Sequence, residues 1–373
     1  LGPGGKETCL IKYLPDASAG EGKISESLQS LLEPEVIQEK IAYDVRGLDP
    51  KEAIEVSRCA YKSHGYSFFD DHIYYPQRLV ELNESGEMVS AVAVTEENVF
   101  MGHAALLYQY PEDRIAELTF VFVNVEYRGQ GAFNRLIEYL FGCPRKRELA
   151  GIYAYAVANH VFTQKAMVRY SINDCGLLLA TSPSSWKFKG IPGEGTQRIS
   201  VVLSFKYMDK PQPKNLYAPA QHRTIIEKLY RNLDAKEHCY LTVEGAAGRP
   251  NPLSVIKTGC NESESCAEIF VERFGDDVVR EVRQWLRKFC VQQIACINLF
   301  LNLEDPGTFT YTSELEKLGF FFAGILPCSR IGDALILQYL NNVDMDYSKM
   351  QLYSEMAKEI HAYIRAHDPN ADI

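Results

Sequence analysis

The chain has 373 residues, 46% of them apolar and 24% charged, and this length favours two domains of ordinary size. Its net charge of −10 argues against nucleic acid as a partner, because phosphate binding needs clustered Lys and Arg. No apolar stretch reaches the roughly 18 residues that a membrane-spanning helix needs, so no membrane association is expected.

The cysteines and the N-terminal residues indicate a cytoplasmic protein. Ten cysteines are scattered without a C-x-x-C pair or another metal-ligand spacing, so we expect no metal site. We interpret them as small reduced thiols. Lys6, Glu7 and Lys12 interrupt any apolar core of a signal peptide, which agrees with this location.

The first part of the chain divides into an arm and a globular region. Residues 1–38 are rich in Gly, Ser, Glu and Pro, which predicts a linker or a loosely attached arm. Residues 39–210 begin with a strand at 41–48 and a helix at 49–65, with Asp49 as its N-cap and Pro50 at its first position. The further predicted elements are two strands within 88–110, a strand at 114–125, a helix at 132–149, a strand at 151–158, a helix at 160–173, and strands at 175–182 and 197–207.

A proline cluster at 211–219 marks a domain boundary, and residues 211–341 then repeat the element order of the first region, β-β-β-α-β-α-β-β, with little identity in sequence. The predicted elements are a helix at 222–234, strands at 239–245, 253–258 and 267–273, a helix at 276–289, a strand at 292–301, a helix at 310–319, and strands at 320–327 and 334–340.

Residues 342–373 predict a final amphipathic helix. Its apolar residues recur at three- and four-residue spacing, and we interpret this stripe as a packing face: Met350, Tyr353, Met356, Ile360, Tyr363 and Ile364.

The stretch VNVEYRGQGAF, residues 123–133, carries the clearest chemical signal. Two glycines, which have no side chains, lie where a predicted strand ends and a helix begins. Without side chains in the way, successive backbone N–H groups can surround a diphosphate. The helix N-terminus adds free donors and the positive end of its dipole. A phosphate-binding P-loop and the dinucleotide-binding G-x-G-x-x-G are both excluded, the latter because Asn134 stands where its last glycine should be.

Strand, Arg-x-x-Gly loop and helix together resemble the acetyl-CoA-binding signature of the GNAT (Gcn5-related N-acetyltransferase) superfamily. The resemblance extends over residues 41–207, and its cytoplasmic bacterial tandem members are the most similar group. It implies an α/β fold of two tandem GNAT-like domains, each a mostly antiparallel mixed sheet flanked by helices, followed by the C-terminal helix. It also implies that acetyl-CoA, or another acyl-CoA, is bound by Val121, Val123, Arg128, Gly129, Gln130, Gly131, Ala132 and Phe133.

The same resemblance assigns the catalytic groups. Glu117, on the strand before the loop, corresponds to the acidic residue that deprotonates an amine directly or through water, and His103 and His160 are alternatives. The Tyr that usually protonates the CoA thiolate is missing, because Met167 and Val168 fall at its position. Ser171 and Ile172 replace the usual Gly-Phe pair, Tyr170 is expected to face elsewhere, and Phe133 replaces the small last residue of the loop.

The second region keeps Gly-Phe at 319–320 but reads VERFGDDVVRE where the phosphate loop should be. Asp276 and Asp277 suit a helix N-cap but would repel a diphosphate. We therefore expect this region to bind no CoA.

Three functional readings stay open at this point. The first is an acyl-CoA-dependent N-acyltransferase with an unknown amine acceptor, in which the second region builds one wall of the acceptor cleft. The second is a CoA-binding regulator with little or no turnover, joined to a signalling domain or partner, and the missing Tyr favours it. The third is a scaffold or homodimerisation module, which the C-terminal helix favours.

Overall fold

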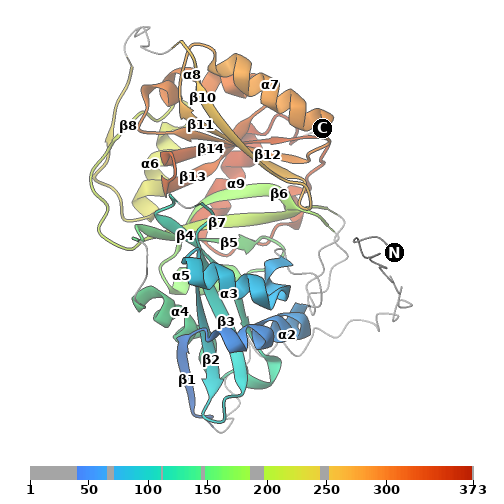
Figure 1. Cartoon of the computed structure of the whole chain (residues 1–373). Helices are drawn as coiled ribbons and strands as arrows, with labels where there is room; N and C mark the ends of the chain where they lie inside the picture. Colours follow the sequence, from blue (N-terminus) through green and yellow to red (C-terminus); the bar gives the residue numbers. More distant parts are fainter. Residues whose placement is uncertain are drawn as a thin grey trace, which may run out of the picture.

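The computed structural model describes residues 40–64, 71–110, 112–143, 148–184, 197–243 and 252–371. The predicted arm at 1–38 lies outside the described residues. Most strands belong to one mixed sheet of twelve strands that runs through the whole molecule, with helices packed on it (Figure 1). The predicted mixed α/β class is therefore confirmed.

The first half of the chain supplies seven strands in the order β1-β2-β3-β4-β5-β7-β6. Its elements are β1 (Tyr43–Gly47), α2 (Ala53–His64), α3 (Pro76–Ser85), β2 (Met88–Thr95), β3 (Phe100–Leu107), β4 (Ile115–Val123), α4 (Ala132–Gly142), β5 (Gly151–Val157), α5 (Phe162–Arg169), β6 (Asn173–Ser182) and β7 (Ile199–Tyr207). All of the strands and helices predicted in this half are present. Helix α3 was not expected.

The expected start of the first helix is nearly correct. Asp49 caps a short 3₁₀ turn, η1 (Pro50–Glu52), by accepting a hydrogen bond from Lys51 N, and α2 continues directly from that turn. Asp49 and Glu52 form a reciprocal capping box, which fixes how the chain enters the helix.

The second half continues the same sheet with the order β13-β14-β12-β11-β10. Its elements are β8 (Asn215–Leu216), α6 (Arg223–Asn232), β9 (Cys239–Tyr240), β10 (Val255–Asn261), β11 (Cys266–Arg273), α7 (Val278–Val291), β12 (Cys296–Asn302), α8 (Pro306–Glu316), β13 (Phe321–Ser329), β14 (Gly332–Leu340) and α9 (Glu355–His367). The strand predicted at 239–245 is shorter than expected, because β9 has only two residues and pairs with β8 outside the main sheet; residues 244–245 lie outside the described residues.

The two halves repeat one another in backbone geometry. The order β3-β4-β5-β7-β6 in the first half corresponds to β10-β11-β12-β14-β13 in the second. The corresponding pairs β4/β5 and β11/β12 are both parallel. Irregular positions recur at the same spacing. Ser171 (φ 56°), Gly176 directly after a bulge in β6, and Ala180 (φ 53°) match Gly319 (φ 100°), Gly324 directly after a bulge in β13, and Cys328 (φ 54°).

Strands β6 and β13 join the halves by an antiparallel contact centred on Gly176 and Gly324. The largest hydrophobic cluster is shared by both halves, since it includes Tyr153 and Leu203 as well as Phe300 and Leu335. Two smaller clusters lie on opposite faces of the first half, one with α4 and the other with α2 and α3. Because this core crosses the predicted boundary near residue 211, neither half is enclosed on its own.

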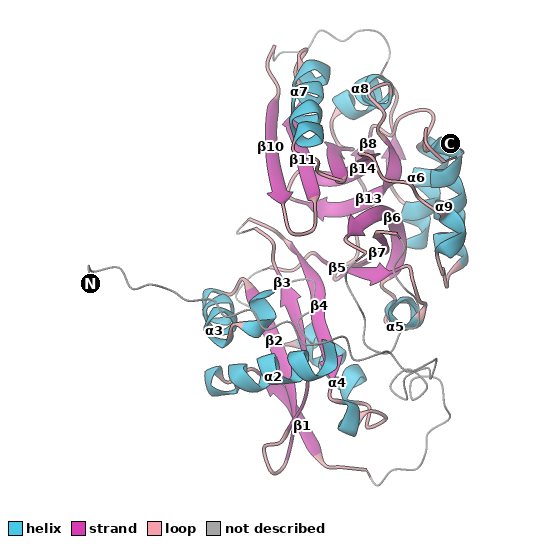
Figure 2. Cartoon of the chain, turned by 90° about the vertical axis from the view of Figure 1, so that its right-hand side faces the viewer, coloured by secondary structure: helices cyan, strands magenta, loops and turns pink. Residues whose placement is uncertain are grey.

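Helix α9 covers the junction between the halves and packs against β6 and β13, beside α6 (Figure 2). Ser354 caps it by accepting from Ala357 N, and its residues Ile360 and Ile364 are fully buried. Met350 and Tyr353 precede the helix, so the predicted stripe was too long at its start. The predicted packing face of α9 is confirmed. Because this face packs against β6 and β13 of the same chain, its apolar stripe no longer favours a dimerisation helix.

We expect Gly324→Ala to lower the free energy of unfolding by about 2–4 kcal/mol, because a Cβ there would lie 2.4 Å from Gly176 Cα at a φ of 145°. Urea unfolding measures this change. Gly142→Ala is the matched control, because a Cβ at Gly142 meets nothing within 4 Å. Equal stability of the two variants would show that the close contact at the junction is not needed.

Candidate active site

Strands β4 and β5 separate after three residue pairs. They pair in parallel at Ile115–Gly151, Ala116–Ile152 and Glu117–Tyr153, and no further pairs follow although β4 continues to Val123 and β5 to Val157. We call the point after the Glu117–Tyr153 pair the fork. Beyond it, backbone groups on the facing edges of both strands lack a strand partner and can accept an extended ligand between them.

A β-bulge in β4 lies just beyond the fork. Two residues of β4, Phe120 and Val121, stand opposite the single residue Ala104 of β3, and Phe120 has a φ of 52°. His103 Nδ1 lies 2.9 Å from Phe120 O and fixes the bulge. Because Asn124 N donates to Met101 O on β3, the neighbouring N–H of Val123 points the other way, into the fork.

The loop from β4 to α4 has the backbone shape that its glycines predict. Gly129 and Gly131 have φ values of 81° and 78°, and a Cβ on Gly129 would meet nothing within 4 Å. Gly131 is the N-cap of α4 and offers no side chain to the first turn, whose N–H groups have no acceptor within the helix. An exposed loop with an uncapped helix N-terminus suits an anion.

Strand β1 and the residues just before it hold this loop. Tyr43 Oη donates to Gln130 O at 3.0 Å, and Ile41 N donates to Gln130 Oε1 at 3.2 Å. Arg135, on α4, donates to Tyr43 O and lies over the Tyr43 ring at 4.4 Å. The bracing uses the carbonyl and side chain of Gln130, and therefore leaves the amide side of the glycine loop for a ligand.

The remaining predicted loop residues are placed as follows. Arg128 is half-buried, and burial lowers its pKa from the ordinary value. Ala132 is buried in the first turn of α4. The Phe133 ring lies 6.4 Å from the Tyr170 ring, so this side chain is held on the side of α5. Tyr170 Oη donates to Asn134 Oδ1 at 2.6 Å and is engaged with α4.

Glu117 is buried at the fork, with 6% of its surface exposed, and accepts a hydrogen bond from Gln109 Nε2 at 3.0 Å. Tyr153 is its register partner, and Tyr155 follows on the same face of β5, with the two rings 5.6 Å apart. Burial, and next the charge of Glu117, raise the pKa of both tyrosines well above the ordinary value. Both hydroxyls therefore keep their protons.

The alternative histidines are poorly suited to act as bases near neutral pH. Burial lowers the pKa of His103 to about 4, and its Nδ1 is used by the bulge. Burial also lowers the pKa of His160 to about 4, and the His160 carbonyl accepts from Gln164 at the start of α5. Glu117 remains the best-placed candidate.

Helix α5 does not supply a proton donor at the expected position. Met167 is buried in the cluster under α4, and Val168 is partly exposed. Ser171 adopts the left-handed conformation that Gly319 adopts in the second half, so Ser171 stands at the position of the usual glycine.

The corresponding strands of the second half stay closed. β11 and β12 pair in parallel over six residue pairs, from Cys266–Cys296 to Val271–Leu301. The loop before α7 is covered, because Gly275 N donates to Ser254 Oγ and a Cβ on Gly275 would lie 2.4 Å from Leu253 C. Asp277 is the N-cap of α7, as its sequence predicted, but its carboxylate accepts from Ser254 N instead of capping the helix.

Several residues of the site escaped sequence reasoning: Tyr43, Gln109, Tyr153 and Tyr155. The alternation in GIYAYAV placed Tyr153 and Tyr155 on one strand face, which is the signal that could have found them. The others act through contacts between segments far apart in the chain.

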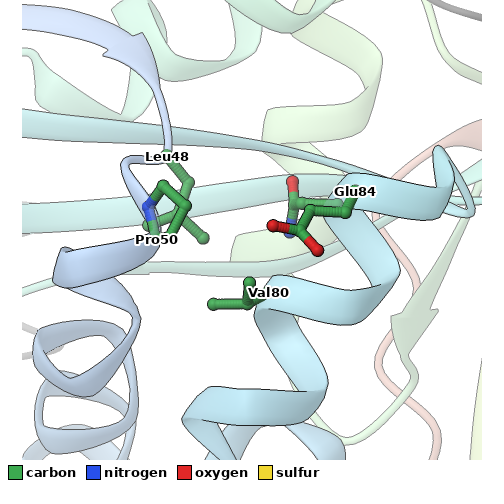
Figure 3. A pocket seen from close by; sticks show the side chains of 5 residues that line it. Leu48, Pro50, Val80 and Glu84 are labelled. Carbon is green, nitrogen blue, oxygen red and sulfur yellow. The ribbon is translucent and has the colours of Figure 1, made fainter.

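Two surface hollows lie elsewhere. One, between the start of α2 and α3, is lined by Leu48, Pro50, Val80, Asn83 and Glu84 (Figure 3). The other surrounds the N-terminus of α7 and includes Asp277 and Trp285. Neither contains a residue of the fork. Within the described residues, no group of three or more His, Cys, Asp or Glu side chains could hold a metal, and no helix is long and apolar enough to cross a membrane.

We expect Tyr43→Phe to raise the hydrogen-exchange rates of the amides at 129–133 about fivefold, since it removes one hydrogen bond worth about 1 kcal/mol from the loop brace. Exchange followed by mass spectrometry measures this effect. Tyr75→Phe is the control, because Tyr75 is 57% exposed and belongs to another surface. Unchanged exchange in the loop would mean that β1 does not hold it.

Comparisons with known proteins agree with this geometry. The model of the Acetyltransferase (GNAT) family matches residues 54–166, which include the fork, the loop and α4. A search of curated proteins found no match.

Among solved structures, ribosomal-protein-S5-alanine acetyltransferase from Vibrio fischeri is 17% identical, with a TM-score of 0.35 over 48% of this chain and 100% of that one. Ribosomal-protein-alanine N-acetyltransferase from Brucella melitensis is 15% identical, with a TM-score of 0.36 over 44% and 99%. The protein yncA from Salmonella typhimurium, solved with acetyl-CoA, is 13% identical, with a TM-score of 0.37 over 46% and 96%. The assignment rests on the family model, which identifies residues 54–166 as a GNAT acetyltransferase domain.

Proposed function

We propose that the chain is an acyl-CoA-dependent N-acyltransferase that transfers an acetyl group from acetyl-CoA to an amine. The observation that carries this proposal is the fork between β4 and β5, which opens directly before a glycine loop and an uncapped helix N-terminus. Residues 39–210 form the acyl-CoA-binding GNAT domain, residues 211–341 a degenerate copy of it, and residues 342–373 the C-terminal helical segment.

The residues present fit the donor. The amides from Gly129 to Phe133 and the N-terminus of α4 would hold the diphosphate, with the Arg128 charge beside them. The free edge of β4, including the Val121 and Val123 backbone, would hold the pantetheine arm by strand-like hydrogen bonds. Acetyl-CoA supplies an acyl group activated as a thioester.

The acceptor's proton has a defined destination in this proposal. Glu117 lies at the fork, and its carboxylate would accept a proton from the amine directly or through one water. Gln109 orients the carboxylate by donating to Oε2. The Val123 N–H points into the fork and would polarise the acyl carbonyl.

A second candidate function, a CoA-binding regulator without turnover, is favoured by Met167. This buried thioether stands where related enzymes place a proton-donating Tyr. The two functions share the donor site and differ in chemistry. Release of free CoA thiol from acetyl-CoA in the presence of an amine panel separates them, because only the acyltransferase shows acceptor-dependent release.

We expect Gly131→Glu to abolish stabilisation by acetyl-CoA, because it places a carboxylate against the diphosphate. Ligand at 100 times its dissociation constant should stabilise the unaltered protein by about 2.7 kcal/mol, and thermal unfolding with and without ligand measures this. Gly142→Glu, at the other end of α4 with open space around it, should keep the full shift. An undiminished shift in Gly131→Glu would overturn the donor-site assignment.

We expect Glu117→Gln to lower kcat about 100-fold or more, the usual contribution of a general base. The KM for acetyl-CoA should change little, because Glu117 lies at the fork, in the last residue pair of the ladder, and not on the glycine loop. Glu126→Gln removes an exposed carboxylate from the start of the loop and serves as the control. Steady-state thiol release measures kcat and KM for both variants. Equal rates for Glu117→Gln and the unaltered enzyme across pH 6–9 would exclude Glu117 as the base.

A further inference from the structure

Glu268 of the second half occupies the position that Glu117 occupies in the first. Glu117 and Tyr153 form the third pair of the parallel β4/β5 ladder, counted from Ile115–Gly151. Glu268 and Asn298 form the third pair of the β11/β12 ladder, counted from Cys266–Cys296. The two carboxylates are therefore structurally equivalent, and the sequences around them are similar, Ala116-Glu117-Leu118 in the first half and Ala267-Glu268-Ile269 in the second.

Glu268 faces the first half of the chain. Its neighbours Ala267 and Ile269 are buried on one face of β11, while Glu268 and Phe270 alternate onto the other. On that face Tyr110, from the loop after β3, donates from Oη to Glu268 Oε2 at 3.4 Å, and the Tyr110 and Phe270 rings lie 6.3 Å apart. The side chain of Glu268 thus projects across the junction toward the loop beside the fork.

The two carboxylates act on the same pair of tyrosines. After burial, the charge of Glu117 and then that of Glu268 are among the causes that raise the pKa of Tyr155. Both charges also raise the pKa of Tyr153. Tyr153 and Tyr155 on β5 therefore lie close enough to one carboxylate from each half to be affected by its charge.

The cation that acts on Glu268, Arg330, is already engaged with other partners. Arg330 lies over the Tyr110 ring at 4.3 Å and pairs with Glu112 at 2.9 Å and with Glu272 at 3.3 Å. Burial raises the pKa of Glu268 to about 7 in spite of Arg330 and the Tyr110 hydroxyl, which both lower it. A bound cation would relieve this cost of burying a carboxylate.

An independent feature, on the face of β4 that carries Glu117, lacks a hydrogen-bond partner. Thr119 follows Glu117 by two residues on β4, and both pair with alternate residues of β3, Ala105 and Leu107, so their side chains share one face. Thr119 is only 4% exposed, and its Oγ1 has no hydrogen-bond partner in the structure. A buried hydroxyl of this kind normally binds a ligand or water.

We propose that the degenerate second half completes the acceptor site, and that Glu268 binds the second positive charge of a diamine-type acceptor whose reacting amine lies at Glu117. This inference rests on the proposed acyltransferase function. Glu268 acts here as a specificity-determining residue: it binds the distant ammonium, whereas Glu117 receives the proton. A monoamine of the same length would fill only one end of the site.

Calorimetric titration of the full chain saturated with CoA tests this inference, with 1,4-diaminobutane and n-butylamine as probes. We expect the diamine to bind at least tenfold more tightly than the monoamine, and Glu268→Gln to reduce that ratio to about one. Glu262→Gln, which removes an exposed carboxylate from the turn before β11, should keep the ratio. Thr119→Val gives a second measurement, with about fivefold weaker binding of the diamine.

Lack of preference for the diamine in the unaltered protein would overturn the inference, as would an unchanged ratio in Glu268→Gln. Failure of the proposed function has a different signature: no amine would release thiol from acetyl-CoA, whatever the binding ratio.

Discussion

The contact between Gly176 and Gly324 is the constraint on which the rest of the molecule depends. Two antiparallel strands meet at this pair without side chains between them, and a Cβ on Gly324 would lie 2.4 Å from Gly176 Cα. The contact joins two similar half-sheets into one and lets a single hydrophobic core and α9 span both. It also turns equivalent faces of both halves to the same side of the sheet, which is why Glu117 and Glu268 influence the same tyrosines.

The difference between the halves lies in how far two parallel strands remain paired. In the first half the pairing stops at Glu117–Tyr153, and a glycine loop braced by Tyr43 follows. In the second half the pairing continues to Val271–Leu301, and residues 253–254 cover the next loop. In the function we propose, the open strand pair of the first half receives the acyl-CoA donor, and the closed second half forms a wall of the acceptor site.

Much of the fold was predictable because its signals are local. Alternating apolar residues gave the strands, Asp49 and Pro50 gave a helix start, and the glycines at 129 and 131 do adopt positive φ. The features that escaped depend on register between distant segments: the short β9, the end of the β4/β5 ladder, and the Tyr43 brace. Asp277 shows the same limit, since Ser254, 23 residues earlier, takes the carboxylate that the sequence assigned to a helix cap.

The central claim is that only one of two equivalent strand pairs receives the donor. A crystal structure of the full chain with CoA tests it most directly. The account predicts one CoA per chain, with its pantetheine arm between β4 and β5 and its diphosphate at the amides of residues 129–133. CoA bound between β11 and β12, or bound on the surface with β4 and β5 empty, would contradict it.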